Sequence, residues 1–353
     1  MSDLIKRRDL ILDLWVVLFG IVGLFSIYSV SPFYLNYQVV FFAVAVIAYF
    51  IISSLSTRYL NYFTIITYFI VLAGLLYLHF FGQSTRGSAA WINFGFINFQ
   101  PSEFSKIIVL LLIAKIFSRT DFLIKKYLLF FITVIPILLL IFLEPDFGNF
   151  FVLLFSVIFT FFIIYIDFKR LVLLFLFLFL SGFLLYSFVL KPYQKQRINS
   201  FLFQQNATRG ANYNLNQSII AIGSGGMFGQ GIKNNSQVIL NFLPEPHTDF
   251  IFSATSEIYG FMYSFLLTIF ILLFLIYLYY KYLLRFNSLY NLLVSSFIFS
   301  IFLIQVILNM GMTVGILPIT GITLPFISYG GSSLITFYIL FSILANINLK
   351  SRF

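Results

Sequence analysis

Long apolar stretches separated by short polar segments run through almost the whole chain. A stretch of roughly 17 to 25 apolar residues can cross a bilayer as a helix. About ten stretches fit this length, and they cover residues 10–30, 37–56, 59–81, 103–118, 127–143, 147–166, 171–190, 250–280, 289–315 and 331–348. The pattern predicts an all-α polytopic membrane protein.

The amino-acid composition agrees with this prediction. Charged residues make up 9% of the chain and hydrophobic residues 61%, whereas a soluble domain is roughly 25% charged. The net charge of +10 would raise the question of nucleic-acid binding in a soluble protein. In a membrane protein the same charge reflects orientation, so no nucleic-acid partner is expected.

The basic residues predict which side of the membrane each loop occupies. Lys and Arg collect in short cytoplasmic loops, and an even number of spans places both termini on one side. With the N-terminus in the cytoplasm, most of the 21 Lys and Arg residues fall on that side, and the short outer segments contain only Arg86 and Lys106. Both termini are therefore predicted to be cytoplasmic.

One long segment, residues 191–249, breaks the pattern of short connections and is predicted to be an extracytoplasmic loop between helices 7 and 8. A loop of that length is usually functional or disordered. Its glycine-rich part GSGGMFGQG, residues 223–231, lacks the Lys of a nucleotide-binding loop and is predicted to be a turn near the membrane surface. Just before it, the spacing of apolar positions suits a short helix at the interface: Leu215, Ile219, Ile220 and Ile222.

A second irregular segment, residues 311–333, is apolar but interrupted by proline and glycine at Pro318, Gly321, Pro325, Gly330 and Gly331. Broken backbone at membrane depth is tolerated only where protein or a watery cavity covers it. This segment is therefore predicted to line a cavity on the outer side.

The predicted topology sorts the ionisable residues by side. The acids Asp3, Asp9, Asp13, Asp121 and Asp167 fall on the inner side beside Lys or Arg and are interpreted as solvated loop charges. The remaining acids and both histidines fall at or near the outer face, and they are Glu103, Glu144, Asp146, Glu245, Asp249, Glu257, His79 and His247. A functional site is therefore expected on the outer side.

Asp249 lies at the predicted start of a membrane helix, in the sequence LPEPHTDFIFS. The positive end of the helix dipole favours its ionised form. Taken alone, the position is more typical of a helix cap made by Thr248 or Asp249. Glu257 lies roughly 12 Å further along the same helix at ~1.5 Å per residue, and an acid at that depth is expected to face a cavity or a partner. The two acids together favour a catalytic role for Asp249.

Two other motifs carry ionisable side chains. In FQPSEFSKI, Glu103 and Lys106 share a helix face and can pair; a structural ion pair is favoured, and contact of Lys106 with a phosphate stays open. In EPDFG, Glu144 and Asp146 flank Pro145 in a short turn. A solvated turn is favoured there, and a divalent cation site stays open.

The motifs FQPSEFSKI, EPDFG, YQKQRI, QSIIAIGSGG, LPEPHTDFIFSATSE and LPITGITLPFISYGGSS, in this order, resemble those of the SEDS family of bacterial shape, elongation, division and sporulation proteins. The resemblance runs from about residue 80 to 335 and implies a single SEDS-type transmembrane domain over 1–353. YQKQRI and NYNLNQSIIAIGSGG are more similar to RodA, the elongation member, than to FtsW, the division member.

The resemblance implies a peptidoglycan glycosyltransferase that polymerises lipid II on the outer leaflet of the bacterial plasma (inner) membrane during cell-wall elongation. Asp249 would be the general base that takes the proton from the acceptor 4-hydroxyl in an inverting transfer, while undecaprenyl diphosphate leaves. The leaving diphosphate needs positive charge. The candidates are Arg197, Lys106 and a divalent cation (Mg²⁺ or Mn²⁺), with Arg197 favoured.

The resemblance implies roles for other residues in the same motifs. Glu103 and Lys106 match the family's QPSE…K pair and would shape the site. Asp146 matches the PD(L/F)G element and is the candidate metal ligand. Further candidate substrate-binding residues are His247, Glu257 and Ser328.

Two departures from the family pattern stand out. Ala89 and Ala90 replace a basic residue usually found before Trp91, so Arg86 is the candidate substitute. Glu144 replaces the more usual Gln before the proline.

The expected partners are lipid II, the growing glycan strand, a class B penicillin-binding protein, other membrane proteins of the elongation complex and membrane lipid. Three alternatives stay open. The first is a division-type, FtsW-like polymerase. The second is a lipid II flippase or transporter, which broken helices also suit. The third is a scaffold for a penicillin-binding partner.

Overall fold

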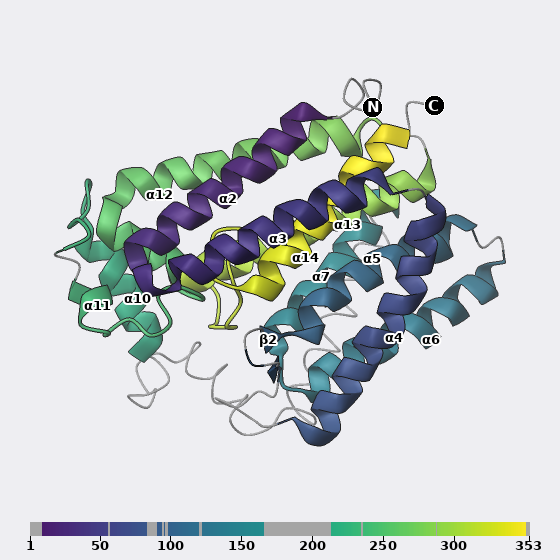
Figure 1. Ribbon diagram of the computed structural model, residues 1–353, viewed down its shortest axis with the longest axis horizontal. Helices are drawn as coiled ribbons and strands as arrows, with labels where there is room; N and C mark the ends of the chain where they lie inside the picture. Colours follow the sequence, from purple (N-terminus) through teal and green to yellow (C-terminus); the bar gives the residue numbers. More distant parts are fainter. Residues whose placement is uncertain are drawn as a thin grey trace.

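Long helices lying side by side make up most of the structure (Figure 1). The computed structural model describes residues 9–55, 57–82, 90–93, 95, 98–119, 122–165, 213–233, 236–286 and 288–350. The predicted helix over 171–190 and the first part of the long loop, up to residue 212, lie outside these ranges.

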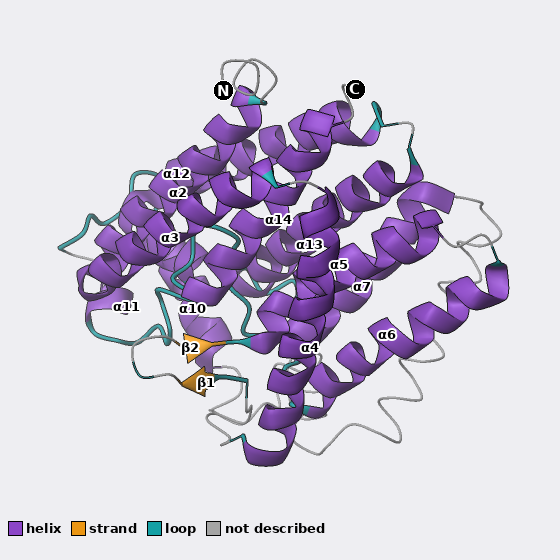
Figure 2. Cartoon of the chain, turned by 45° about the vertical axis from the view of Figure 1, so that its right-hand side comes forward, coloured by secondary structure: helices purple, strands orange, loops and turns teal. Residues whose placement is uncertain are grey.

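In chain order, the helices are α2 (Leu10–Val30), α3 (Leu35–Ser54), α4 (Thr57–Phe81), α5 (Pro101–Arg119), α6 (Leu123–Leu143), α7 (Phe147–Tyr165), α10 (Tyr213–Ser224), α11 (Ser236–Ile239), α12 (Ile251–Leu278), α13 (Leu289–Thr313) and α14 (Gly331–Lys350). The 3-10 helix η1 (Pro32–Tyr34) joins α2 to α3, and the π-helix η4 (Tyr279–Leu283) extends α12. Two short strands, β1 (Ile92–Asn93) and β2 (Asn98–Phe99), form an antiparallel pair (Figure 2).

Within the described residues, eight helices are long and apolar enough to cross a membrane. They are Leu10–Val30, Pro32–Ser54, Tyr62–Phe81, Leu123–Leu143, Phe147–Ile164, Ile251–Leu283, Leu289–Thr313 and Gly331–Asn348. The prediction of a polytopic all-α protein is confirmed. The first of these helices begins, and the last ends, at the same end of the bundle (Figure 1); that this end is cytoplasmic stays a prediction.

The most polar long helix, α5, lies in the interior. It packs against α4, α6, α13 and α14, and most of its residues are buried, including Glu103 and Lys106. Ionisable side chains are expensive in lipid and face the inside of a bundle, which explains why α5 occupies this position. Its neighbour α14 is also central, and most of its residues are buried.

A buried aromatic cluster fixes the irregular segment between α13 and α14 to the core. Phe326, which has φ +66°, lies with its ring 5.3 Å from Phe19 and 5.5 Å from Phe341. It also contacts Phe337 and Tyr338. The segment therefore enters the bundle and is held there by ring packing.

The prediction that Asp9 is a solvated loop charge is wrong. Asp9 is 5% exposed, and its Oδ2 atom accepts hydrogen bonds from the hydroxyls of Tyr277 (2.8 Å) and Tyr282 (2.7 Å) and from Asn348 Nδ2 (3.4 Å). Lys281 Nζ lies 3.6 Å from the same oxygen. The start of α2 is thereby joined to the ends of α12 and α14. The acids Asp3, Asp121 and Asp167 lie outside the described residues.

The Asp9→Ala variant is expected to lose about 2 kcal/mol or more of unfolding free energy, because hydrogen bonds to charged groups contribute roughly 1.5–3 kcal/mol each. Thermal unfolding in detergent measures the loss. The Asp9→Asn variant keeps one acceptor oxygen and is expected to lose less. Equal stability of all three proteins would contradict a structural role for this cluster.

Candidate functional site

The candidate site residues within the described ranges belong to the first parts of α5 and α12 or to the turns that precede α7, α12 and α14. They are Glu103, Lys106, Asp146, His247, Asp249, Glu257 and Ser328. Arg197, the candidate diphosphate ligand, lies outside the described residues, as do Arg86 and Ala89.

Asp249 is half-buried in the turn that precedes α12. The N-cap residue of α12 is Phe250, so neither Thr248 nor Asp249 holds the cap position, which was the alternative to a catalytic role for Asp249. Asn309 of α13 donates through Nδ2 to the carbonyl of Asp249 (3.0 Å) and to that of Ile322 (2.7 Å). The backbone of Asp249 is thereby held to both α13 and the irregular segment.

The carboxylate of Asp249 faces a glycine of the irregular segment. Gly321 has φ +71°, and a Cβ atom built there would stand 3.4 Å from Asp249 Oδ2. A left-handed backbone favours glycine, and the lack of a side chain leaves space beside the carboxylate. The segment thus lies against Asp249; that it lines a cavity on the outer side stays a prediction.

Ser328 joins the irregular segment to the turn that carries Asp249. Its hydroxyl donates to the carbonyl of Thr248 (2.6 Å) and accepts from the amide of Leu324 (2.8 Å). The neighbouring Tyr329 amide donates to the carbonyl of His247 (2.8 Å). Ser328 thus positions the turn, and its direct contact with substrate stays a prediction.

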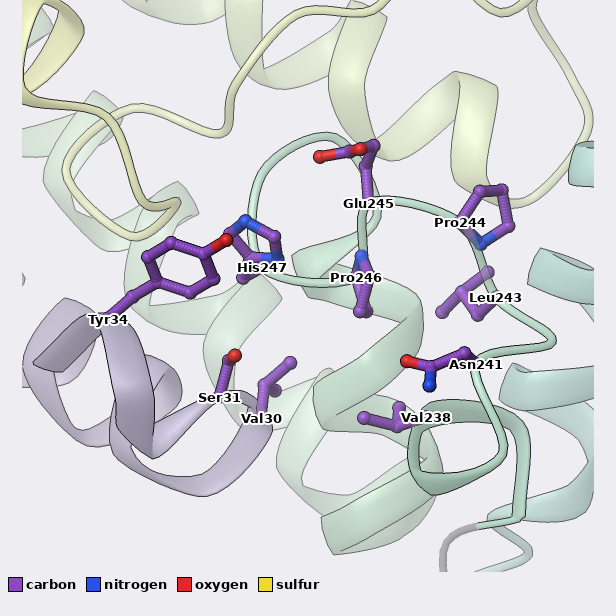
Figure 3. A pocket seen from close by; sticks show the side chains of 10 residues that line it. All are labelled: Val30, Ser31, Tyr34, Val238, Asn241, Leu243, Pro244, Glu245, Pro246 and His247. Carbon is purple, nitrogen blue, oxygen red and sulfur yellow. The ribbon is translucent and has the colours of Figure 1, made fainter.

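A pocket of about 330 Å³ lies beside this turn (Figure 3). The His247 ring stacks on Tyr34 of η1 with 4.2 Å between ring centroids, and Tyr329 lies 5.6 Å from His247. His247, two residues before Asp249 in the same turn, lines this pocket, whereas Asp249 itself does not. Its lining consists of Val30, Ser31, Tyr34, Val238, Asn241, Leu243, Pro244, Glu245, Pro246 and His247.

The predicted ion pair between Glu103 and Lys106 is confirmed. Lys106 Nζ lies 2.8 Å from Glu103 Oε1 and donates to Gln305 Oε1 at 2.9 Å. Lys106 is 0% exposed. Gln305 in turn donates to the carbonyl of Thr323 (3.0 Å), so the pair joins α5, α13 and the irregular segment. Contact of Lys106 with a substrate phosphate stays a prediction.

Asp146 accepts four hydrogen bonds. Its Oδ2 atom accepts from Gln100 Nε2 (3.0 Å), Ser102 Oγ (2.6 Å) and Asn149 Nδ2 (3.1 Å), and its Oδ1 atom accepts from the Asn149 amide (3.2 Å). Oδ2 thus accepts three of these bonds and Oδ1 one, which ties Asp146 to the start of α5 and to Asn149 of α7. The described residues contain no group of three acidic, His or Cys side chains placed to hold a metal ion, and a role of Asp146 as a metal ligand stays a prediction.

Glu144 is not in a solvated turn, and that prediction is wrong. It is 2% exposed, and neither carboxyl oxygen has a hydrogen-bond partner within the described part of the chain. The next residue, Pro145, has φ +27°. Burial, with a contribution from the nearby charge of Asp146, raises the pKa of Glu144 to about 9. Glu144 is therefore protonated at neutral pH.

The raised pKa of Glu144 predicts a pH dependence of stability. Between its ordinary pKa of 4.5 and about 9, the folded chain holds a proton that the unfolded chain releases, so stability falls as pH rises through this range. The Glu144→Gln variant is expected to be more stable than the unchanged chain at pH 8 and to depend less on pH. Melting temperatures at pH 5 and pH 8 test this, and an unchanged slope in the variant would contradict it.

A break in α12 was not predicted from the sequence. Gly260 has φ 81° and ψ −176° inside this helix, so a short first segment ends just before it. The loop at residues 225–231 lies over the break: the amides of Gln230 and Gly231 donate to the carbonyls of Glu257 and Ile258, both at 2.9 Å. The loop thus satisfies backbone groups that the break would leave unpaired at membrane depth.

Glycine is required where the two backbones meet. A Cβ atom at Gly260 would stand 2.3 Å from the amide nitrogen of Gly229, and one at Gly229 would stand 2.1 Å from the carbonyl oxygen of Ile258. Glu257, just before the break, is buried, and its Oε1 atom accepts from the Gln237 amide (2.8 Å). The expectation that Glu257 has a partner is confirmed, and its contact with substrate stays a prediction.

The Gly260→Ala variant is expected to lose roughly 1–3 kcal/mol of stability, the usual range for a strained backbone position, together with much of its activity. Gly223→Ala is the matched control, because nothing lies within 4 Å of a Cβ atom there and the residue is helical. Thermal unfolding of the two variants is the measurement. Equal melting temperatures would show that the glycine contact is dispensable.

Gln305 and Asn309, whose amides hydrogen-bond to the irregular segment and to the turn that carries Asp249, were also not predicted from the sequence. They are spaced four apart in the apolar helix α13 and therefore share a face. An amide inside a membrane helix usually hydrogen-bonds to a neighbouring segment, and this was the available signal.

The chain is similar in sequence to proteins of one known family. A family model that describes the FtsW/RodA/SpoVE group, "Cell cycle protein", matches residues 10–353. The stage V sporulation protein E of Bacillus subtilis (strain 168) is 33% identical over 367 residues, which cover 98% of both chains. The peptidoglycan glycosyltransferase MrdB of Escherichia coli (strain K12) is 32% identical over 284 residues, 80% of this chain and 76% of that one.

Solved structures show the same fold. A chain from a structure described as "Structural coordination of polymerization and crosslinking by a peptidoglycan synthase complex" has a TM-score of 0.82 at 27% identity and covers 98% of both chains. The rod shape determining protein RodA of Thermus thermophilus has a TM-score of 0.69 at 26% identity, over 97% of this chain and 96% of that one. The chain therefore belongs to the FtsW/RodA/SpoVE family of polytopic membrane proteins, the SEDS proteins.

Proposed function

We propose that this chain is a peptidoglycan glycosyltransferase that polymerises lipid II, with Asp249 as the general base. Relatives named peptidoglycan glycosyltransferase, among them MrdB, support the activity. The observation that carries the assignment of Asp249 is its position: a half-buried carboxylate that faces Gly321 of the irregular segment, with its backbone held by Asn309, in the same turn as His247, which lines a pocket.

The proposed step joins the acceptor sugar to the donor sugar. The oxygen of the acceptor 4-hydroxyl forms a bond to the anomeric carbon of the donor sugar, and its proton passes to Asp249. The bond between the anomeric carbon and the diphosphate oxygen breaks, and undecaprenyl diphosphate leaves with the electron pair. Attack opposite the leaving group inverts the anomeric configuration.

The pocket lined by His247 suits a sugar. Its lining combines the stacked rings of Tyr34 and His247 with the polar groups of Ser31, Asn241 and Glu245. Sugar rings pack against aromatic side chains through their apolar faces, and their hydroxyls both donate and accept hydrogen bonds. His247 would orient the sugar next to the reacting hydroxyl.

The leaving diphosphate needs positive charge, and Arg197 is the favoured source. Lys106 is already paired with Glu103 and bonded to Gln305, so we assign this pair to positioning the irregular segment. A divalent cation bound with the diphosphate, with Asp146 as its candidate ligand, is a further proposal.

The chain is a multi-pass protein of the bacterial inner membrane. Its relatives suggest the partners that we propose for it. The structural neighbour from a peptidoglycan synthase complex that coordinates polymerization and crosslinking supports a class B penicillin-binding protein as partner. Other membrane proteins of the elongation complex are proposed with it. Because relatives carry both FtsW and MrdB names, a role in elongation rather than division remains our proposal, based on the YQKQRI segment.

The deciding experiment adds lipid II to the purified chain in liposomes, with and without a class B penicillin-binding protein, and follows glycan strands by gel electrophoresis. Strand formation that depends on this chain is expected. Movement of lipid II across the bilayer without polymer would favour the flippase alternative instead. Polymer that forms only through the partner's own activity would leave this chain a scaffold.

A further inference from the structure

The loop at residues 225–231, called the glycine loop below, lies over the break in α12. Its tip, Met227 and Phe228, is apolar and has no part in the proposed function. At this tip Phe228 is 80% exposed and Met227 is 55% exposed. Large apolar side chains that are exposed together mark a surface that contacts something other than water. The loop belongs to the connection between predicted helices 7 and 8, where exposure to water would otherwise be expected.

Backbone hydrogen bonds place this tip beside the exposed apolar face of α12. The amide of Met262 donates to the carbonyl of Met227 (3.1 Å), and the amide of Phe261 donates to the carbonyl of Gly226 (2.8 Å). Phe261 and Met262 are themselves exposed. The tip therefore continues the outward apolar face of a membrane-spanning helix.

The length of α12 and η4 indicates the depth of the tip. Together they form an apolar run of 33 residues, Ile251–Leu283, which the break at Gly260 divides into a short and a long part. The hydrocarbon core is only about 30 Å thick. The part after Gly260 is about 35 Å long and crosses the core by itself. The break and the tip thus lie where the acyl chains meet the headgroups.

We propose that Met227 and Phe228 form a lipid anchor, covered by the acyl chains of the leaflet at that end of the bundle. Bilayer lipid is the occupant because the tip extends, without interruption, the exposed apolar face of a membrane-spanning helix. The anchor holds the glycine loop against the break at Gly260. Through this contact it positions the short first segment of α12, which starts two residues after Asp249.

Tryptophan fluorescence tests the anchor without any enzyme assay. The chain has two Trp residues, and in a Trp15→Phe, Trp91→Phe background the Phe228→Trp substitution provides a single reporter at the tip. The full chain is reconstituted in phosphatidylethanolamine and phosphatidylglycerol liposomes with brominated acyl chains. We expect the brominated lipid to quench most of the emission of the Trp at position 228. We expect iodide, which stays in water, to quench little of it. A Trp placed at the exposed position two residues after the loop, by Lys233→Trp, should be quenched by iodide and little by brominated lipid.

Other outcomes overturn the anchor. Quenching of the position-228 reporter by iodide and not by brominated lipid would place the tip in water. Protection from both quenchers would show that protein covers it.

A second arm links the anchor to the site and rests on the proposed function. Phe228→Asp is expected to lower the rate of lipid II polymerisation several-fold in liposomes, whereas Phe228→Leu keeps an apolar tip and should keep the rate. Melting temperatures of both variants show whether they are folded. A folded Phe228→Asp variant with the full rate would overturn the link. Failure of every protein to polymerise, with lipid quenching intact, would instead reject the proposed function and leave the anchor standing.

Discussion

The Asp249→Asn variant is expected to polymerise lipid II at least about a hundredfold more slowly than the unchanged chain, since a positioned general base contributes roughly 10²- to 10⁴-fold. Asn has nearly the same size and keeps the backbone bond from Asn309 to the carbonyl at position 249. It cannot take the proton from the acceptor hydroxyl. The rate is measured with purified lipid II in liposomes, where strand length and substrate consumption are followed together.

A second carboxylate-to-amide change provides the matched control. Asp13 lies near the start of α2, at the other end of the bundle, where it accepts a hydrogen bond from the Tyr49 hydroxyl (2.6 Å). An amide oxygen can accept the same bond, so Asp13→Asn is expected to retain the rate. A full rate in Asp249→Asn, with unchanged melting temperature, would show that this carboxylate is not the base.

The Lys106→Met variant is expected to lose about 3–5 kcal/mol of unfolding free energy, because removing one partner of a buried ion pair leaves an uncompensated charge. Here the remaining charge is Glu103, which is buried and whose Oε2 atom has no hydrogen-bond partner within the described part of the chain. Denaturation in mixed micelles, followed by helix content, measures the loss.

The double variant Glu103→Gln, Lys106→Met separates the charge from the packing. Two neutral side chains of similar size fit the same space, and replacing a buried ion pair by neutral groups is often close to neutral. The double variant is therefore expected to recover most of the stability lost in Lys106→Met. If it is no more stable than the single variant, the pair's charge is not the cause of the loss.

The helices could be predicted because each membrane span must satisfy its backbone hydrogen bonds internally. That requirement makes a long apolar stretch a reliable sign of a helix: α5 was predicted over 103–118 and observed at Pro101–Arg119. The Glu103–Lys106 contact was predictable for a similar reason, since residues three apart on a helix are neighbours.

Features that depend on partners distant in the sequence could not be predicted in this way. The break at Gly260 requires the loop at residues 225–231 to supply its hydrogen bonds, and in the sequence Gly260 resembles any glycine in an apolar run. The burial of Glu144 depends on how α6 and α7 meet. The bonds of Asn309 to Asp249 and Ile322 join three segments, and no local pattern specifies them.

The cluster around Asp9 also bears on how the chain is made. Asp9 precedes Tyr277 by 268 positions and Asn348 by 339. At a synthesis rate of about 5–20 residues per second, the ribosome needs tens of seconds to reach these partners. During that interval the first helix must wait in the bilayer with its acid in contact with water. Docking of this helix at Asp9 is therefore a late event, because it needs α12, η4 and α14 to be in place.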